Sequence, residues 1–103
     1  MQDPQSLPPL PATERLILEM LVSSGNEMFG LELIEASNGR LKRGTIYVTL
    51  QRMAKKGLVE SREEARVAPE IGIPRRLYVA SGFGVRVLRA YASAASTFAM
   101  EVG

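Results

Sequence analysis

The residues best equipped for chemistry in this sequence are the positively charged side chains between positions 40 and 62. That stretch carries seven Lys and Arg residues and one Glu, whereas residues 1–39 carry six acidic residues and one Arg. A local excess of positive charge of this size is typical of a surface that binds a polyanion such as nucleic acid. A solvated helix face without a partner is the alternative, and charge alone does not decide between the two.

Enzymatic chemistry finds little support in the composition. The sequence has no Cys and no His, so the usual thiol, imidazole and zinc sites are missing. Glu63, Glu64 and Glu70 lie in a charged segment with no partner base and no set of metal ligands. We therefore expect a protein that is not an enzyme and that uses no metal or other cofactor.

The composition also bears on where the protein works. With 46% hydrophobic and 23% charged residues over 103 positions, it is typical of one globular domain. No apolar run approaches the roughly 18 residues of a membrane span, and the lack of Cys suits a reducing compartment. We expect a cytoplasmic protein with no membrane association.

Hydrophobic spacing and turn residues predict four helices and two strands. The first 12 residues include four prolines and are expected to form an extended arm. Beyond the arm, apolar side chains recur at helical spacing, and Gly or Asn marks several ends. We expect helices over 13–22, 28–37, 43–56 and 81–103, N-caps at Thr13 and Ser81, and strands over 58–62 and 76–80.

This order of elements is that of a winged helix-turn-helix domain. Three helices precede two strands joined by a hairpin loop, residues 63–75, and in such a fold the third helix enters a DNA groove. The predicted fold class is mainly α with a small β component (α+β). The predicted organisation is a proline-rich arm over 1–12, a DNA-binding domain over 13–80 and a C-terminal dimerisation helix over 81–103.

The third helix, residues 43–56, has one apolar side and an opposite side suited to reading DNA. That side offers an amide, a guanidinium and small groups, which is the mixture needed at base edges. Gln51 and Arg52 are the strongest candidates for such contacts, and Lys55 and Lys56 suit the DNA backbone. An ordinary solvated face is the alternative. The predicted outward face comprises Thr45, Val48, Thr49, Gln51, Arg52 and Lys55.

Other residues could meet phosphates. Lys42 and Arg43 precede or begin the third helix, where cations oppose the helix dipole, and a phosphate bound there would make them favourable. Side chains that simply point into water are the alternative. Tyr47, at the edge of the apolar side, can bury its ring and still offer its hydroxyl to a phosphate. The wing adds Arg66, Arg75 and Arg76, which could reach the minor groove or flanking phosphates.

The last helix carries an apolar stripe along about 20 residues. A helix of that length spans roughly 30 Å, more than a small three-helix core can cover, so the stripe needs another surface. A second copy of the chain is the simplest partner. A small-molecule effector between two subunits is also open, because no residue identifies or excludes one. The predicted dimer contacts are Val85, Leu88, Tyr91, Ala92, Ala95, Phe98 and Ala99.

Several separate segments resemble the PadR family of transcriptional regulators. Gly44-Thr45-Ile46-Tyr47 resembles that family's recognition helix, and Lys56-Gly57-Leu58-Val59 its junction between helix and wing. Arg76-Leu77-Tyr78-Val79 resembles the second wing strand, and Phe29-Gly30-Leu31-Glu32-Leu33 the opening of the second helix. The resemblance covers about residues 13–92. It implies a winged-helix domain, a dimer formed through the terminal helix, and binding to palindromic operator DNA.

Together these observations predict a sequence-specific DNA-binding transcriptional regulator, a repressor that acts as a homodimer on double-stranded palindromic operator DNA. A different class of function also suits a winged helix. The chain could be a protein-interaction module that docks an acidic partner protein through the same basic face. Binding to random duplex DNA at low salt distinguishes the two, because only the DNA-binding protein is expected to show it.

Overall fold

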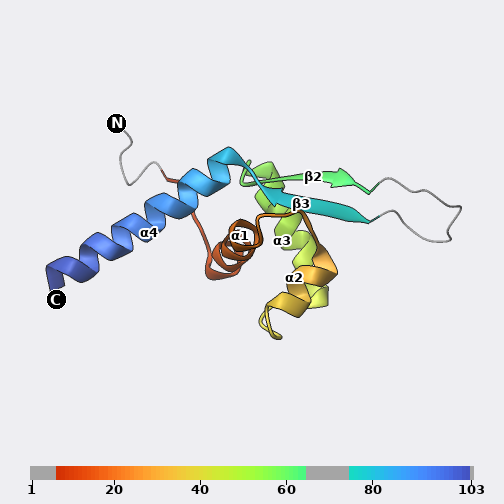
Figure 1. Cartoon of the computed structure of the whole chain (residues 1–103), viewed down its shortest axis with the longest axis horizontal. Coiled ribbons are helices and arrows are strands. Elements are labelled where there is room, and N and C mark those ends of the chain that lie inside the picture. Colours follow the sequence, from red (N-terminus) through yellow and green to blue (C-terminus); the bar gives the residue numbers. More distant parts are fainter. Residues whose placement is uncertain (1–6, 65–74, 103) are drawn as a thin grey trace, which may run out of the picture.

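The computed structural model describes residues 7–64 and 75–102, with residues 95–102 described by their backbone alone. Figure 1 shows the three shorter helices grouped beside a small sheet, while the long last helix runs away from the other elements. The predicted mainly α class with a β wing is confirmed. In chain order the elements are α1 (Ala12–Ser24), β1 (Met28–Phe29), α2 (Gly30–Ala36), α3 (Arg43–Lys55), β2 (Val59–Glu63), β3 (Arg76–Ala80) and α4 (Gly82–Val102).

The sheet has a strand that the sequence pattern did not predict. Its order is β1-β3-β2 and both pairings are antiparallel, with Met28 opposite Tyr78 and Val59 opposite Ala80. The sequence predicts a helix from Met28, but this residue pairs with β3. The edge of β3 that faces away from β2 has backbone N–H and C=O groups that β1 can bond. The N–H of Phe29 then donates to Oε1 of Glu32 at 2.7 Å. This bond caps α2, which therefore begins only at Gly30.

The ends of the other helices follow local backbone chemistry. Thr13 is not the first N-cap: Pro11 takes that place with φ −56° and ψ 155°, and its carbonyl accepts the N–H of Arg15 at 2.9 Å. The fixed φ of proline suits this position. At α4 the predicted cap is confirmed, because Oγ of Ser81 accepts the N–H of Gly84 at 2.9 Å.

The core joins all four helices to the sheet. Close packing fixes the start of α4, since a Cβ built on Gly84 would lie 2.1 Å from the carbonyl oxygen of Leu58. Only glycine therefore allows α4 to approach the chain before β2 this closely. The buried apolar side chains are Ile17, Leu18, Leu21, Leu33, Leu41, Ile46, Leu50, Met53, Leu58, Val59, Tyr78 and Val87.

Candidate nucleic-acid interface

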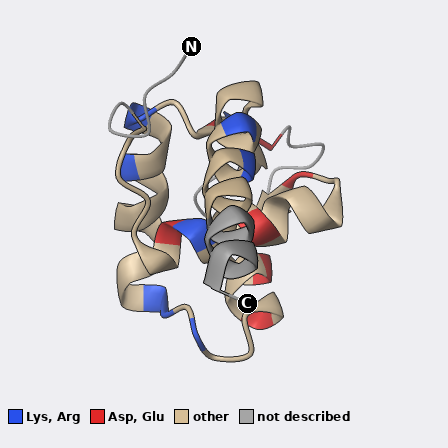
Figure 2. Cartoon of the chain, turned by 90° about the vertical axis from the view of Figure 1, so that its left-hand side faces the viewer, with Lys and Arg blue, Asp and Glu red and all other residues tan. Residues whose placement is uncertain are grey.

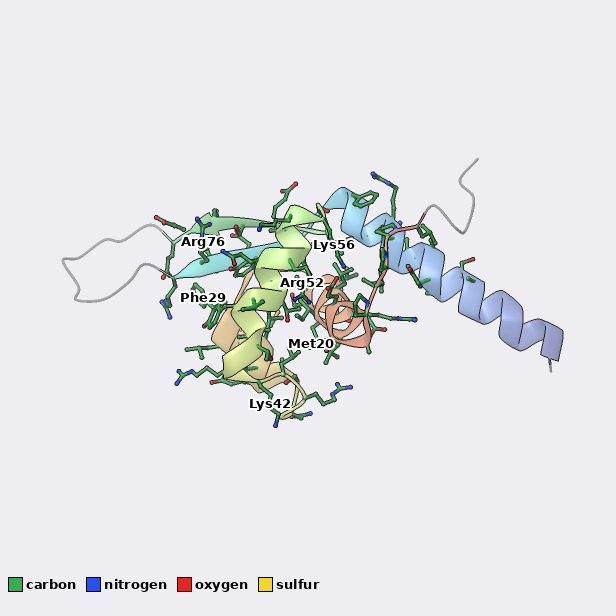
Figure 3. All side chains as sticks on the ribbon, turned by 180° about the vertical axis from the view of Figure 1, so that it is seen from behind. Met20, Phe29, Lys42, Arg52, Lys56 and Arg76 are labelled. Atoms are coloured by element: carbon green, nitrogen blue, oxygen red, sulfur yellow. The ribbon has the colours of Figure 1, made fainter. Side chains whose placement is uncertain are left out.

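α3 lies at the surface and turns one side into the core. Ile46, Leu50 and Met53 are buried on that side, and none of the other helices and strands that the structure describes covers the opposite side (Figure 3). Figure 2 shows Lys and Arg along α3 and in the loop before it, whereas most Asp and Glu lie on the other side of the molecule. The predicted contact residues that are exposed here are Lys42, Arg43, Thr45, Tyr47, Val48, Gln51, Arg52 and Lys55.

Thr49 does not belong to this exposed side, although the sequence analysis placed it there. Its side chain is buried, with 8% of its surface exposed, and its hydroxyl donates to the carbonyl of Thr45 at 2.9 Å. The reason is helical spacing, because Thr49 comes three residues after Ile46 and four before Met53. It therefore belongs to the edge of the apolar side and is removed from the candidate contacts.

The N-terminus of α3 concentrates exposed donors and positive charge. Lys42 is the N-cap residue, no side chain caps the helix, and the first turn contains no acid. The first N–H groups of a helix lack partners within the helix. With Lys42 and Arg43 exposed beside them, these groups form a place where an anion would be stabilised by the dipole and two cations together.

Tyr47 connects α3 with α2 and with the wing. Its side chain is 48% exposed, and its ring lies so close to Gly30 that a Cβ there would be 2.6 Å from a ring carbon. A hollow of about 570 Å³ lies toward α2 and another of about 380 Å³ toward the wing, and Tyr47 and Tyr78 line both. Burial raises the pKa of the Tyr78 hydroxyl, because the ionised form is less well solvated there.

The wing cations are partly occupied by contacts within the chain. A nitrogen of Arg75 lies 3.0 Å from Oε2 of Glu64, and Nη1 of Arg76 donates to Oγ of Ser61 at 3.1 Å. Both arginines remain exposed, and either would have to leave its partner within the chain to bind a phosphate. Arg66, the third predicted wing contact, lies outside the described residues.

A further cation of the basic segment has a partner that the sequence did not indicate. Arg62 on β2 donates two hydrogen bonds, each 2.7 Å long, to the carboxylate of Glu27. These bonds lower the pKa of Glu27 and raise that of Arg62. The pair joins the residues before β1 to β2. Arg62 therefore adds to the positive charge of residues 40–62, but its guanidinium already has a partner within the chain.

Lys56 is turned inward, whereas the sequence analysis placed it on the DNA backbone. Its Nζ donates to Oε1 of Glu14 at 2.8 Å and to the carbonyl of Pro9 at 3.3 Å. Glu14 is buried, with 1% of its surface exposed. Glu14 is not among the residues singled out from the sequence. Its spacing from Ile17 and Leu18 does place it on the buried side of α1.

The predicted dimer contacts on α4 divide into three groups. Val85, Leu88 and Tyr91 are partly buried, because Leu88 and Tyr91 pack against the core of their own chain. The hydroxyl of Tyr91 also donates to the carbonyl of Pro8 at 2.7 Å. Ala92 is exposed. The side chains of Ala95, Phe98 and Ala99 lie outside those that the structure describes, in the half of α4 that extends from the body (Figure 1).

Other kinds of site are not formed by the residues that the structure describes. Among them, no three acidic or metal-ligating side chains come together to hold a metal ion. Within the same residues, no helix combines the length and hydropathy needed to cross a bilayer.

The comparison with protein families decides the class of this protein. The model of the "Transcriptional regulator PadR-like family" matches residues 17–90. The chain belongs to the PadR-like family. As a PadR-like protein it is a DNA-binding transcriptional regulator and not an enzyme, which confirms both predictions. α3 is the helix that the sequence analysis expected to enter a DNA groove, so its exposed residues form the candidate DNA interface.

Solved structures support the same fold for this PadR-like chain. A PadR family transcription regulator from Clostridium difficile R20291 is 26% identical, with a TM-score of 0.67 over 85% of this chain and 90% of the other. A PadR family regulator from Eggerthella lenta DSM 2243 is 23% identical, with a TM-score of 0.66 over 88% and 80% of the two chains. None of the curated proteins compared matches the sequence.

Proposed function

We propose that this PadR-like regulator represses transcription as a homodimer that binds palindromic operator DNA and blocks a promoter. Each subunit lays α3 into a major groove, and the two half-sites lie about one DNA turn, ~10 bp, apart. The protein works in the cytoplasm, where it has access to DNA. The observation that carries the proposal is the exposed side of α3, which has cations at its N-terminus and an amide and a guanidinium further along.

The contacts divide by their chemistry. Lys42, Arg43 and Lys55 bind backbone phosphates, which supply affinity that does not depend on sequence. Gln51 and Arg52 bind base edges, where an amide prefers adenine and a guanidinium prefers guanine. Val48 is exposed and suits contact with a thymine methyl group. This division supports a regulator that finds DNA through charge and selects its operator through a few side chains.

The dimer is supported by the direction and composition of α4. The helix spans Gly82–Val102, and its outer half extends away from the other elements (Figure 1). The apolar stripe continues there at Ala95, Phe98 and Ala99, and an equivalent helix of a second subunit would cover it. A symmetric dimer also matches the two-fold symmetry of a palindromic site.

The test is a titration of the protein with duplex DNA by fluorescence anisotropy. One duplex is random, and the other comes from the region upstream of the protein's own gene. We expect binding to both at low salt, tighter binding to the upstream duplex, and a steep loss of affinity as salt rises. If neither duplex binds at low salt, the proposal is wrong and the alternative, an acidic partner protein, is favoured.

A further inference from the structure

The carboxylate of Glu14 lies inside the protein directly against the recognition helix. Its Oε1 accepts the hydrogen bond from Nζ of Lys56 at 2.8 Å. Its Oε2 is buried and has no hydrogen-bond partner among the described residues, and Nη1 of Arg52 is 4.0 Å away. A buried carboxylate is costly unless nearby cations compensate it. Glu14 therefore attracts two cations toward the body of the domain: Arg52 of α3, and Lys56, the C-cap residue that follows this helix.

These two cations differ in how strongly the protein holds them. Lys56 donates to Glu14 and to the carbonyl of Pro9, and only 25% of its side chain is exposed. Arg52 is 57% exposed and lies between Glu14 and solvent. They are four residues apart, so they lie on the same side of α3, the side that faces α1 (Figure 3).

Lys55 provides a natural comparison on the same helix. It is exposed and forms no ion pair with any other described residue. Lys55, the last residue of α3, and Lys56, its C-cap, thus differ in their partners. One is available to a phosphate, and the other already has an anion.

We propose that Glu14 is a positioning residue that sets the DNA specificity of this regulator. Glu14 binds Lys56 and attracts Arg52. Fewer positive charges at this end of α3 are therefore free to bind the phosphates of random DNA. A phosphate must compete with Glu14 for Arg52, whereas a guanine edge offers two acceptors to the guanidinium. Non-specific binding is almost wholly electrostatic, so withholding these charges weakens it more than operator binding. The inference rests on the proposed function.

The first test replaces the charge and keeps the shape, with Glu14→Gln. Affinity for random duplex is expected to rise by roughly fivefold to tenfold at 0.1 M salt for each additional phosphate that the variant binds. The slope of log affinity against log salt should steepen by about one unit for each such phosphate, and the ratio of operator to random affinity should fall. A purely structural role would lower the melting temperature and change both affinities by the same factor.

The lysine pair identifies which side chains bind the additional phosphates. Lys55→Gln should flatten the salt slope both in the wild type and in the Glu14→Gln variant. Lys56→Gln should flatten it only when combined with Glu14→Gln, which releases Lys56. The double variant also avoids leaving a buried carboxylate without its hydrogen-bonded cation, so it separates charge from folding. Equal effects of Lys56→Gln in both backgrounds would overturn the inference.

A measurement on the unaltered protein does not depend on any variant that might unfold. Brief acetylation followed by mass spectrometry should modify Lys56 much more slowly than Lys55 in the free protein. Random duplex should then protect Lys55 and leave the rate at Lys56 unchanged. Equal acetylation rates of Lys55 and Lys56 in the free protein would overturn this inference but not the proposed function. The same holds if folded Glu14→Gln and the wild type have equal salt slopes and equal ratios of operator to random affinity. Failure of the wild type to bind any duplex would overturn the proposed function with it.

Discussion

At the scale of single residues, the N-terminus of α3 carries charge that a free helix does not favour. Lys42 and Arg43 are exposed there with no acid in the first turn. Each cation costs about 0.3–1 kcal/mol against the helix dipole when exposed. The two cations become favourable in a DNA-bound state, because the helix dipole and both cations then attract the same phosphate.

Removing both charges should therefore change stability and DNA binding in opposite directions. For Lys42→Ala/Arg43→Ala we expect the free energy of unfolding to rise by about 0.3–1 kcal/mol for each cation removed. The slope of log affinity against log salt should flatten by about 0.9 for each lost phosphate contact. Chemical denaturation and anisotropy at several salt concentrations measure the two effects.

The matched control removes the same net charge from α4. Arg86 and Arg89 are exposed there, and Arg86→Ala/Arg89→Ala should leave the salt slope closer to that of the wild type. If the two double variants flatten the slope equally, the phosphate contact at α3 is wrong, and only the total charge of the molecule matters.

The pair between Glu27 and Arg62 gives a pH dependence. Hydrogen bonding to Arg62 holds the pKa of Glu27 below its ordinary value of 4.5. The pair therefore adds stability above pH 4.5, and that contribution is lost as the pH falls through the lowered pKa of the folded state. We expect Glu27→Gln to melt below the wild type at pH 7 and at the same temperature in strong acid. Glu35→Gln, which removes an exposed carboxylate with no described ion pair, should show no such convergence.

At the scale of elements, the start of α4 is held by a close backbone contact. The missing side chain of Gly84 lets the first turn of α4 lie against the carbonyl of Leu58. The N–H of Ser81 also donates to that carbonyl, at 3.0 Å. The contact fixes how the long helix leaves the winged domain and hence how two recognition helices are spaced in a dimer.

We therefore expect Gly84→Ala to be strongly destabilising. The new Cβ would be 2.1 Å from a backbone oxygen, which cannot move aside as a flexible side chain can. Forcing atoms into a packed site costs about 1–3 kcal/mol or more, and we expect the upper end. A loss of about 3 kcal/mol lowers the melting temperature of a domain of this size by roughly 12 °C or more. Thermal denaturation followed by circular dichroism measures it.

Gly82→Ala is the control for this contact. A Cβ on Gly82 would have only the flexible end of Arg86 nearby, at 3.6 Å, so a change within about 1 kcal/mol is expected. Similar melting temperatures for the two variants would show that the chain can shift at Gly84, and α4 would then not be held by this contact.

At the scale of the whole molecule, α4 begins on the winged domain, and its second half extends away from the other elements (Figure 1). Leu88 and Tyr91 anchor the first half on the domain, so the dimer contacts proposed from the sequence fall mainly on the second half. Two subunits joined there would present two copies of α3 to one duplex. Linking two binding sites raises affinity by roughly 10²–10⁴ without any new contact.

A charge on the apolar stripe should therefore reduce both assembly and DNA binding. We expect Phe98→Glu to shift the protein from dimer to monomer in light scattering. Its operator affinity should fall by as much as roughly 10²–10⁴, with little change in helix content. Ser93→Glu adds the same charge at an exposed position off the stripe and should remain dimeric. A wild-type protein that is monomeric at micromolar concentration would contradict the proposed dimer.

The sequence by itself determined the class and order of the elements. The winged order, β3 and the Ser81 cap could be predicted because hydrophobic spacing and turn residues act over a few neighbouring positions. The cations at the start of α3 and the exposure of Val48, Gln51 and Lys55 also follow from position along one helix. The PadR resemblance likewise rested on short segments in a fixed order.

Only the tertiary structure decided which charges have partners. Glu14 lies 42 positions before Lys56, and Glu27 lies 35 before Arg62, so no local pattern could join them. Strand β1 depends in the same way on the open edge of β3. These contacts arise because packing the core brings distant segments together, and the buried carboxylate of Glu14 then pairs with the nearest cation. In this protein, the tertiary fold determines which Lys and Arg side chains already have a partner within the chain and which are available to bind DNA.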